Sequence, residues 1–163
     1  MNALTYKNRD VLVVDNSPTL DFLLRWQDLV PMVHIDADRE RSLLRITQSM
    51  EVIRKHFLAG PWTRWFNLES DVIPPPDVIE RMLSLGRDSD WISHAYPMRG
   101  KHTDDEQGIG CSILSRRLMA AFSFDNCGDD SPDGWLWAKV RPQRHYRVME
   151  LWGYFPVIHL KEA

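Results

Sequence analysis

The segment at residues 65–76, WFNLESDVIPPP, constrains the fold more than any other stretch of the chain. It begins as an apolar run typical of a buried strand, and Pro74 to Pro76 end that strand because proline has no backbone N–H to donate to a sheet. Glu69 and Asp71 lie one residue apart between these parts, so on extended backbone their side chains point to the same face. Two carboxylates at a strand end suit a hard divalent cation, and open α/β sheets bind ligands at that edge.

Strands and helices alternate through the first half of the chain. Residues 10–15, DVLVVD, form a continuous apolar run of the kind found in strands that are buried on both faces. The pattern then predicts a helix over residues 21–29, a strand over 31–36 and a long helix over about 41–58. The apolar face of the long helix is predicted to hold Leu43, Ile46, Met50, Ile53 and Phe57. This alternation indicates an α/β protein with a doubly wound layer.

The second half is predicted to continue the alternation with shorter elements. Helices are expected at residues 77–85, 116–121 and 135–140. Strands are expected at residues 89–96, 110–114, 147–151 and 156–160.

Composition narrows the class of protein. A chain of 163 residues fits one domain, 1–163, with a single sizeable core. Its net charge of −3 gives no basic field for nucleic acid. No apolar run reaches the roughly 20 residues needed to cross a bilayer, and the polar start resembles no secretory signal. The two cysteines form no disulfide framework, so we expect a cytoplasmic protein with reduced thiols and no transmembrane segment.

Three segments together resemble the GT-A glycosyltransferases, particularly the family 2-like ones. FNLESDVIPPPDVIERML at residues 66–83 is similar to their metal-binding segment, in which a strand ends in a DxD-type acidic motif. VVDNS at 13–17 resembles their nucleotide-contacting segment, and GIGCSILSRR at 108–117 resembles the acceptor side of their pocket. The resemblance covers about residues 10–160. It implies a single-domain, Rossmann-like GT-A sandwich with a mostly parallel central sheet flanked by helices.

The resemblance also implies roles for individual residues. It assigns contacts with the nucleotide sugar to Asp15, Ser17, Asp36, Arg45 and Glu69. It assigns a metal ion, Mn²⁺ or Mg²⁺, to Asp71 and His159, and the role of catalytic base to Asp133. The implied reaction moves a sugar from a UDP- or GDP-type donor to the hydroxyl of an unidentified acceptor, with inversion.

Each assignment has a structural alternative. Asp15 fits an Asx-turn that leaves a strand, and Arg45 fits a solvated helix face. Asp133 fits a helix N-cap, and Asp129 and Asp130 are rivals for the base because a proline stands where the family usually has its first acid. The same acids also fit a non-catalytic nucleotide-sugar- or carbohydrate-binding module, or a metal-dependent enzyme that acts on nucleotides or pyrophosphates.

The chain departs from the family at its N-terminus. The family usually begins with one more strand and helix, whereas this sequence enters at what resembles the second strand. The edge of the strand at residues 10–15 is therefore expected to lack a partner. We expect the N-terminal arm or a second copy of the chain to cover it, and the second case would give a homodimer.

Overall fold

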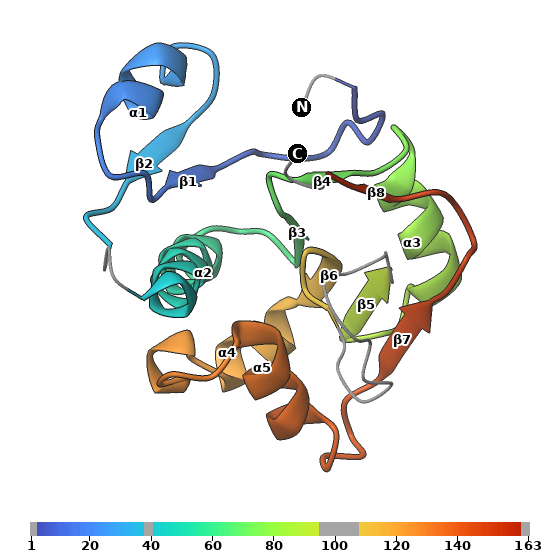
Figure 1. The fold of residues 1–163 in the computed structure, drawn as a ribbon. Helices are drawn as coiled ribbons and strands as arrows, with labels where there is room; N and C mark the ends of the chain where they lie inside the picture. The colour runs from blue at the N-terminus through green and yellow to red at the C-terminus, as the bar shows by residue number, and fades with distance from the viewer. Residues whose placement is uncertain (1–2, 38–40, 95–107, 161–163) are drawn as a thin grey trace.

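The computed structural model describes residues 3–37, 41–94 and 108–160, which form a mixed α/β fold (Figure 1). Its strands are β1 (Val13–Asp15), β2 (Met32–His34), β3 (Arg64–Leu68), β4 (Val72–Ile73), β5 (Trp91–His94), β6 (Cys111–Ser115), β7 (Val148–Leu151) and β8 (Ile158–His159). Its helices are α1 (Asp21–Trp26), α2 (Ser42–Ala59), α3 (Val78–Gly86), α4 (Arg116–Ala121) and α5 (Pro132–Val140), with a 3₁₀ turn, η1, at Phe124–Asn126. None of these helices is long and apolar enough to cross a membrane.

The strands form three separate sheets. The largest has the order β3-β6-β5-β7, while β1 pairs with β2 and β4 pairs with β8. Pairing is parallel for β1–β2 and β5–β7, and antiparallel for β3–β6, β5–β6 and β4–β8. The expected mostly parallel sheet is therefore wrong. Because β6 runs opposite to both neighbours, β3 and β5 are parallel to each other, with α3 as the connection between them, but they do not touch. An apolar run indicates burial and carries no direction, so the sequence pattern could not predict this reversal.

Helices cover both faces of the four-stranded sheet. Trp91 belongs to a core cluster on the face of α2, α4 and α5, whereas Ile92 belongs to a second cluster on the face of α3. These faces follow from the strand period, in which successive side chains point to opposite sides. Every residue of β5 and β6 is buried, as expected for central strands between two helical layers.

Helix α2 is exposed at the start of its predicted apolar face and buried further along it. Met50 and Phe57 are buried, but Leu43 and Ile46 are 42% and 40% exposed. Glu51 is buried instead, where its carboxylate pairs with Arg54 at 2.8 Å and accepts a backbone hydrogen bond at the start of η1. The first half of α2 therefore presents apolar side chains to solvent.

A single arginine closes the carboxyl end of α2. Arg116, the first residue of α4, donates to the backbone carbonyls of Phe57, Leu58, Gly60 and Trp62. The last carbonyls of a helix have no partner inside it. Arg116 therefore satisfies several orphan acceptors at once and ties α2 to the start of α4.

Several element boundaries differ from the prediction. Helix α5 begins at Pro132 rather than 135, because the Ser131 side chain caps it by accepting from the Gly134 N–H at 3.2 Å. The strand that Pro74 to Pro76 were predicted to end is divided into β3 and β4, with residues 69–71 between them. The last two residues of the strand predicted at 89–96 lie outside the described residues.

The N-terminal arm, residues 3–10, crosses the molecule before β1 begins (Figure 1). Thr5 donates its N–H to the Pro76 carbonyl at 2.8 Å, and Leu4 and Tyr6 pack against the core cluster on the α3 face. Among the strands that the structure describes, β1 pairs with β2 alone.

Candidate functional site

The carboxyl ends of β1 and β2 hold a hydrogen-bonded acid and histidine. The parallel register places Asp15 beside His34, and His34 Nδ1 lies 2.9 Å from Asp15 Oδ2. The Ser17 N–H donates to Asp15 Oδ1 at 3.0 Å, which is the Asx-turn that the structural alternative predicted. Burial raises the pKa of the Asp15 carboxyl, but the bonds from His34 and Ser17 outweigh it and hold that pKa below its usual value. Asp15 is thus a carboxylate held in place by hydrogen bonds. The sequence pattern predicted Asp15 as a site residue but did not predict its partner, His34.

The same strand end contacts the first half of α2. Asn16 donates its side-chain amide to the Ser49 hydroxyl at 3.0 Å, and that hydroxyl donates to the Arg45 carbonyl at 2.9 Å. Arg45 therefore lies one turn before the point where α2 meets β1. Asp36 is exposed just beyond β2.

The Glu69-x-Asp71 motif lies apart from Asp15, next to the pairing of β4 with β8. Glu69 follows β3 directly, and its carbonyl accepts from the Val72 N–H at 3.2 Å. The Asp71 carbonyl accepts from the Leu160 N–H at 2.7 Å, and the register sets His159 opposite Val72. The fold thus brings the backbone of His159 next to the motif, although these segments are far apart in the sequence.

Cys111 lies beside this motif but is not a nucleophile. Burial raises the pKa of its thiol to about 12, with a further contribution from the charge of Glu69. The thiolate is the reactive form of cysteine, so Cys111 stays protonated and structural.

Asp133 is the second residue of α5, and Ser131 is the cap. The interpretation of Asp133 as the N-cap is therefore wrong. Asp130 and Asp133 both lie close enough to Cys127 to add to the effect of burial in raising the pKa of its thiol. The rival Asp129 is exposed and pairs with Arg41 at 3.4 Å, just before α2. The turn before α5 thus lies along the first half of α2, the same part that contacts β1.

In Figure 1 the chain descends through α5 to a loop at the bottom of the view and then turns back up into β7. A connection of a few residues joins the end of α5 at Val140 to the start of β7 at Val148. Asp133, in the first turn of α5, is therefore at the end of the helix away from this connection.

A row of polar side chains crosses the sheet near the carboxyl ends of β3 and β5, and its members were not predicted as site residues. Asn67 of β3 is paired with Ser112 of β6, which is paired with Ser93 of β5. All three are buried, and the Ser93 hydroxyl has no hydrogen-bond partner within the described parts of the chain. The sequence feature that could have indicated this row is the presence of Asn and Ser inside otherwise apolar strands.

The metal prediction remains a prediction. Among the side chains that the structure describes, no group of three His, Cys, Asp or Glu residues is arranged to hold a metal ion. The side chain of His159 is outside that description.

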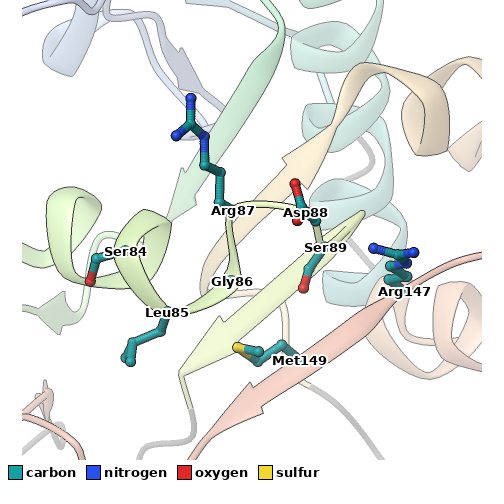
Figure 2. A pocket seen from close by; sticks show the side chains of 8 residues that line it. All are labelled: Ser84, Leu85, Gly86, Arg87, Asp88, Ser89, Arg147 and Met149. Atoms are coloured by element: carbon teal, nitrogen blue, oxygen red, sulfur yellow. The ribbon is translucent and has the colours of Figure 1, made fainter.

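An open pocket of about 410 Å³ lies elsewhere, where α3 ends and where β5 and β7 begin (Figure 2). Its lining consists of Ser84, Leu85, Gly86, Arg87, Asp88, Ser89, Arg147 and Met149. None of the residues that the sequence assigned to a site lines it. The pocket is at the amino ends of β5 and β7, opposite to the edge that carries the candidate site.

Comparison with known proteins gives fold likenesses only. No family model matches the chain, and no curated protein matches it. Among solved structures, it is similar to A197 from STIV, with a TM-score of 0.57 and 13% identity over 94% of this chain and 86% of that chain. It is also similar to a "putative nucleotide-diphospho-sugar transferase" from Desulfovibrio desulfuricans G20, with a TM-score of 0.55 and 12% identity over 93% of this chain.

The structural likeness to the Desulfovibrio protein concerns the same class of protein as the sequence resemblance to GT-A glycosyltransferases. This chain spans 62% of the Desulfovibrio protein's length. At such low identity the likeness shows the fold alone, so the α/β architecture is shared with a protein of that name. The activity of the present chain must be argued from its own residues.

Proposed function

We propose that this chain is a GT-A-like, metal-dependent glycosyltransferase that moves a sugar from a nucleotide-diphosphate donor to an acceptor hydroxyl, with inversion. The observation that carries the proposal is the pairing of β4 with β8, which brings His159 beside the Glu69-x-Asp71 motif. The fold likeness to the Desulfovibrio protein supports the same function.

The donor would be held by two groups of residues. Asp15, held by Ser17, would accept hydrogen bonds from the nucleoside. Arg45 lies on α2 and Asp36 lies just beyond β2. Asp71 and His159, with Glu69 nearby, offer carboxylate and imidazole ligands that suit Mn²⁺ or Mg²⁺. A bound metal ion would supply positive charge for the departing diphosphate.

Asp133 would take the proton of the acceptor hydroxyl. It lies in the first turn of α5, where the partial positive charge of the helix end stabilises the ionised carboxylate. A base must be ionised before the reaction, so this position suits the role. Asp129 and Asp130, which precede the helix, are its rivals.

Donor binding is the first test. The melting temperature should rise more with UDP or GDP in MnCl₂ than with the same nucleotide in EDTA, because a ligand that binds only the native state stabilises it. Asp71→Asn should remove most of the metal-dependent rise. Asp77→Asn is the matched control, since Asp77 is a nearby carboxylate that pairs with Arg81 on α3. Equal shifts in MnCl₂ and EDTA would contradict the metal role.

Donor turnover is the second test. Asp133→Asn should leave nucleotide binding intact and lower the rate of sugar transfer by roughly 10²–10⁴-fold, the usual effect of losing a general base. Asp130→Asn tests the rival. Release of a sugar phosphate would identify a pyrophosphate-cleaving enzyme, and binding without turnover in the wild-type chain would identify a binding module.

A further inference from the structure

The pocket between the end of α3 and the starts of β5 and β7 contains a serine hydroxyl that the described chain leaves without a hydrogen bond (Figure 2). Ser89 is only 7% exposed, yet no described residue pairs with its hydroxyl. Its Oγ is not among the fully enclosed unpartnered atoms of the described residues, so the oxygen is open to the pocket that Ser89 lines. Figure 2 shows Ser89 extending to the side where Met149 lies, whereas Asp88 extends in the opposite direction.

Arg147 supplies a guanidinium group from the neighbouring strand. Its backbone is fixed, because its N–H donates to Asp90 Oδ2 at 3.1 Å and its carbonyl accepts from the N–H of Trp91 at 3.2 Å. Its side chain has no ion-pair partner among the described residues, and the nearby Asp90 carboxylate is already bound by Arg117. Arg147 therefore presents unused donors from a fixed position at the rim of the pocket.

The charge around the pocket is more positive than the chain as a whole, which carries a net charge of −3. Arg64 donates to the backbone carbonyls of Arg87 and Ser89, which offsets the partial negative charge at the end of α3. Arg87 lines the pocket together with Arg147, and Asp88 is the one carboxylate among the lining residues. Such a local excess of positive charge attracts anions.

We propose that this pocket binds a small organic anion, with Arg147 and Ser89 as hydrogen-bond donors to its phosphate or carboxylate group. A guanidinium group suits both, because its N–H groups match the spacing of their oxygen atoms. Leu85 and Met149 also line the pocket and offer contact to an apolar part of the ligand. The volume of about 410 Å³ fits a small molecule. This inference does not rest on the proposed function, since none of the residues assigned to the nucleotide sugar lines the pocket.

The experiment is calorimetric titration in EDTA, at constant ionic strength, with three probes: butyl phosphate, pentanoate and butanol. At least one of the two anions should bind, and butanol, which lacks the charge, should not. The tighter of the two anions identifies the preferred group. EDTA removes the metal on which the proposed donor site depends, and Asp71→Asn should bind the anion like the wild type. Binding here and binding of a nucleotide can therefore fail independently.

Two substitutions test the donors. Arg147→Gln should weaken binding of the anion roughly tenfold or more, as expected for a hydrogen bond between charged groups. Ser89→Ala should weaken it by a smaller factor. The matched control is Arg144→Gln, because Arg144 is an exposed arginine on the same connection that does not line the pocket. The melting temperatures of the Arg147 and Ser89 variants should stay close to that of the wild type, since these side chains have no partner among the described residues.

Three results would overturn the inference. If neither anion binds to the wild-type chain, the pocket is only a surface hollow. If butanol binds as tightly as the anions, the charged groups play no part. If Arg147→Gln and Arg144→Gln weaken binding equally, the anion responds to general surface charge rather than to this pocket.

Discussion

The β1-α1-β2 unit and the four-stranded sheet differ sharply in burial. Neither core cluster of the described residues includes a side chain from residues 13–34, and α1 has no buried residue. In contrast, every residue of β5 and β6 is buried between helices. The sheet therefore holds most of the stabilising apolar contact. The thinly packed unit carries the Asp15–His34 pair, which belongs to the proposed donor site, and ligand-binding elements often come from the less stable parts of a fold.

The two regions should differ most in the free energy of unfolding that is lost when one tryptophan is removed from each. Trp91 is fully buried in the sheet, while Trp26 of α1 is 40% exposed. Trp91→Ala should lower the free energy of unfolding by about 3–5 kcal/mol, the usual range for a buried aromatic side chain. Trp26→Ala should lower it by less than about 1 kcal/mol. Urea unfolding curves measure both, and similar losses would show that the two regions are packed alike.

A smaller effect should come from the buried carboxylate at the start of β5. Asp90 accepts hydrogen bonds from Ser115, Arg117 and the Arg147 N–H. Burial raises the pKa of Asp90, but these bonds outweigh it and leave that pKa below its usual value. The carboxylate therefore stabilises the fold above a pH of about 4, the unfolded-state value, and its contribution is lost as pH falls through the folded-state pKa.

Asp90→Asn tests this contribution at two pH values. At pH 7 the variant should be less stable than the wild type by about 1.5–3 kcal/mol, the range for hydrogen bonds to a charged group. Near pH 2.5 the two proteins should be closer in stability. Asp21→Asn, which changes an exposed acid on α1, is the control and should track the wild type at both pH values. If the difference in stability between Asp90→Asn and the wild type stays constant with pH, the ionised Asp90 carboxylate does not make this contribution.

The smallest effect is expected at the surface of the β1-α1-β2 unit. Leu29 and Leu24 are 76% and 61% exposed, so Leu29→Ser should change the free energy of unfolding by no more than about 0.5 kcal/mol. Hydrogen exchange sharpens the same comparison, since backbone amides of α1 should exchange far faster than those of β5 and β6. Slow exchange in α1 would show that this surface is covered in solution.

Local patterns predicted most elements but not their arrangement. The helix at 42–59 and the strand at 64–68 were predictable because their apolar residues recur at fixed periods. The antiparallel direction of β6 was not, because burial on both faces leaves the same sequence pattern in either direction. The exposure of Leu43 and Ile46 was also missed, since periodicity defines a helix face without showing whether another element covers it.

A sequence pattern points to candidate site residues where a side chain sits next to a recognisable strand end, as for Asp15 and Asp71, and these two assignments stay predictions. The partner His34 could not be predicted, because its role depends on the register between two strands. The polar row through Ser112 depends on register in the same way. Chemistry that a single segment carries is thus visible in a sequence, whereas chemistry that two strands share appears only once they are paired.

Strand β6 is the last part of the sheet's centre to be synthesised, although it lies between β3 and β5. While the chain emerges from the ribosome, β3 and β5 each have an unpaired edge until residues 111–115 have been synthesised. Exposed edges of apolar strands are prone to pairing with other chains. The fold therefore exposes its growing chain to aggregation until β6 arrives, and the yield of soluble protein should depend on chaperones and on the speed of translation through this interval.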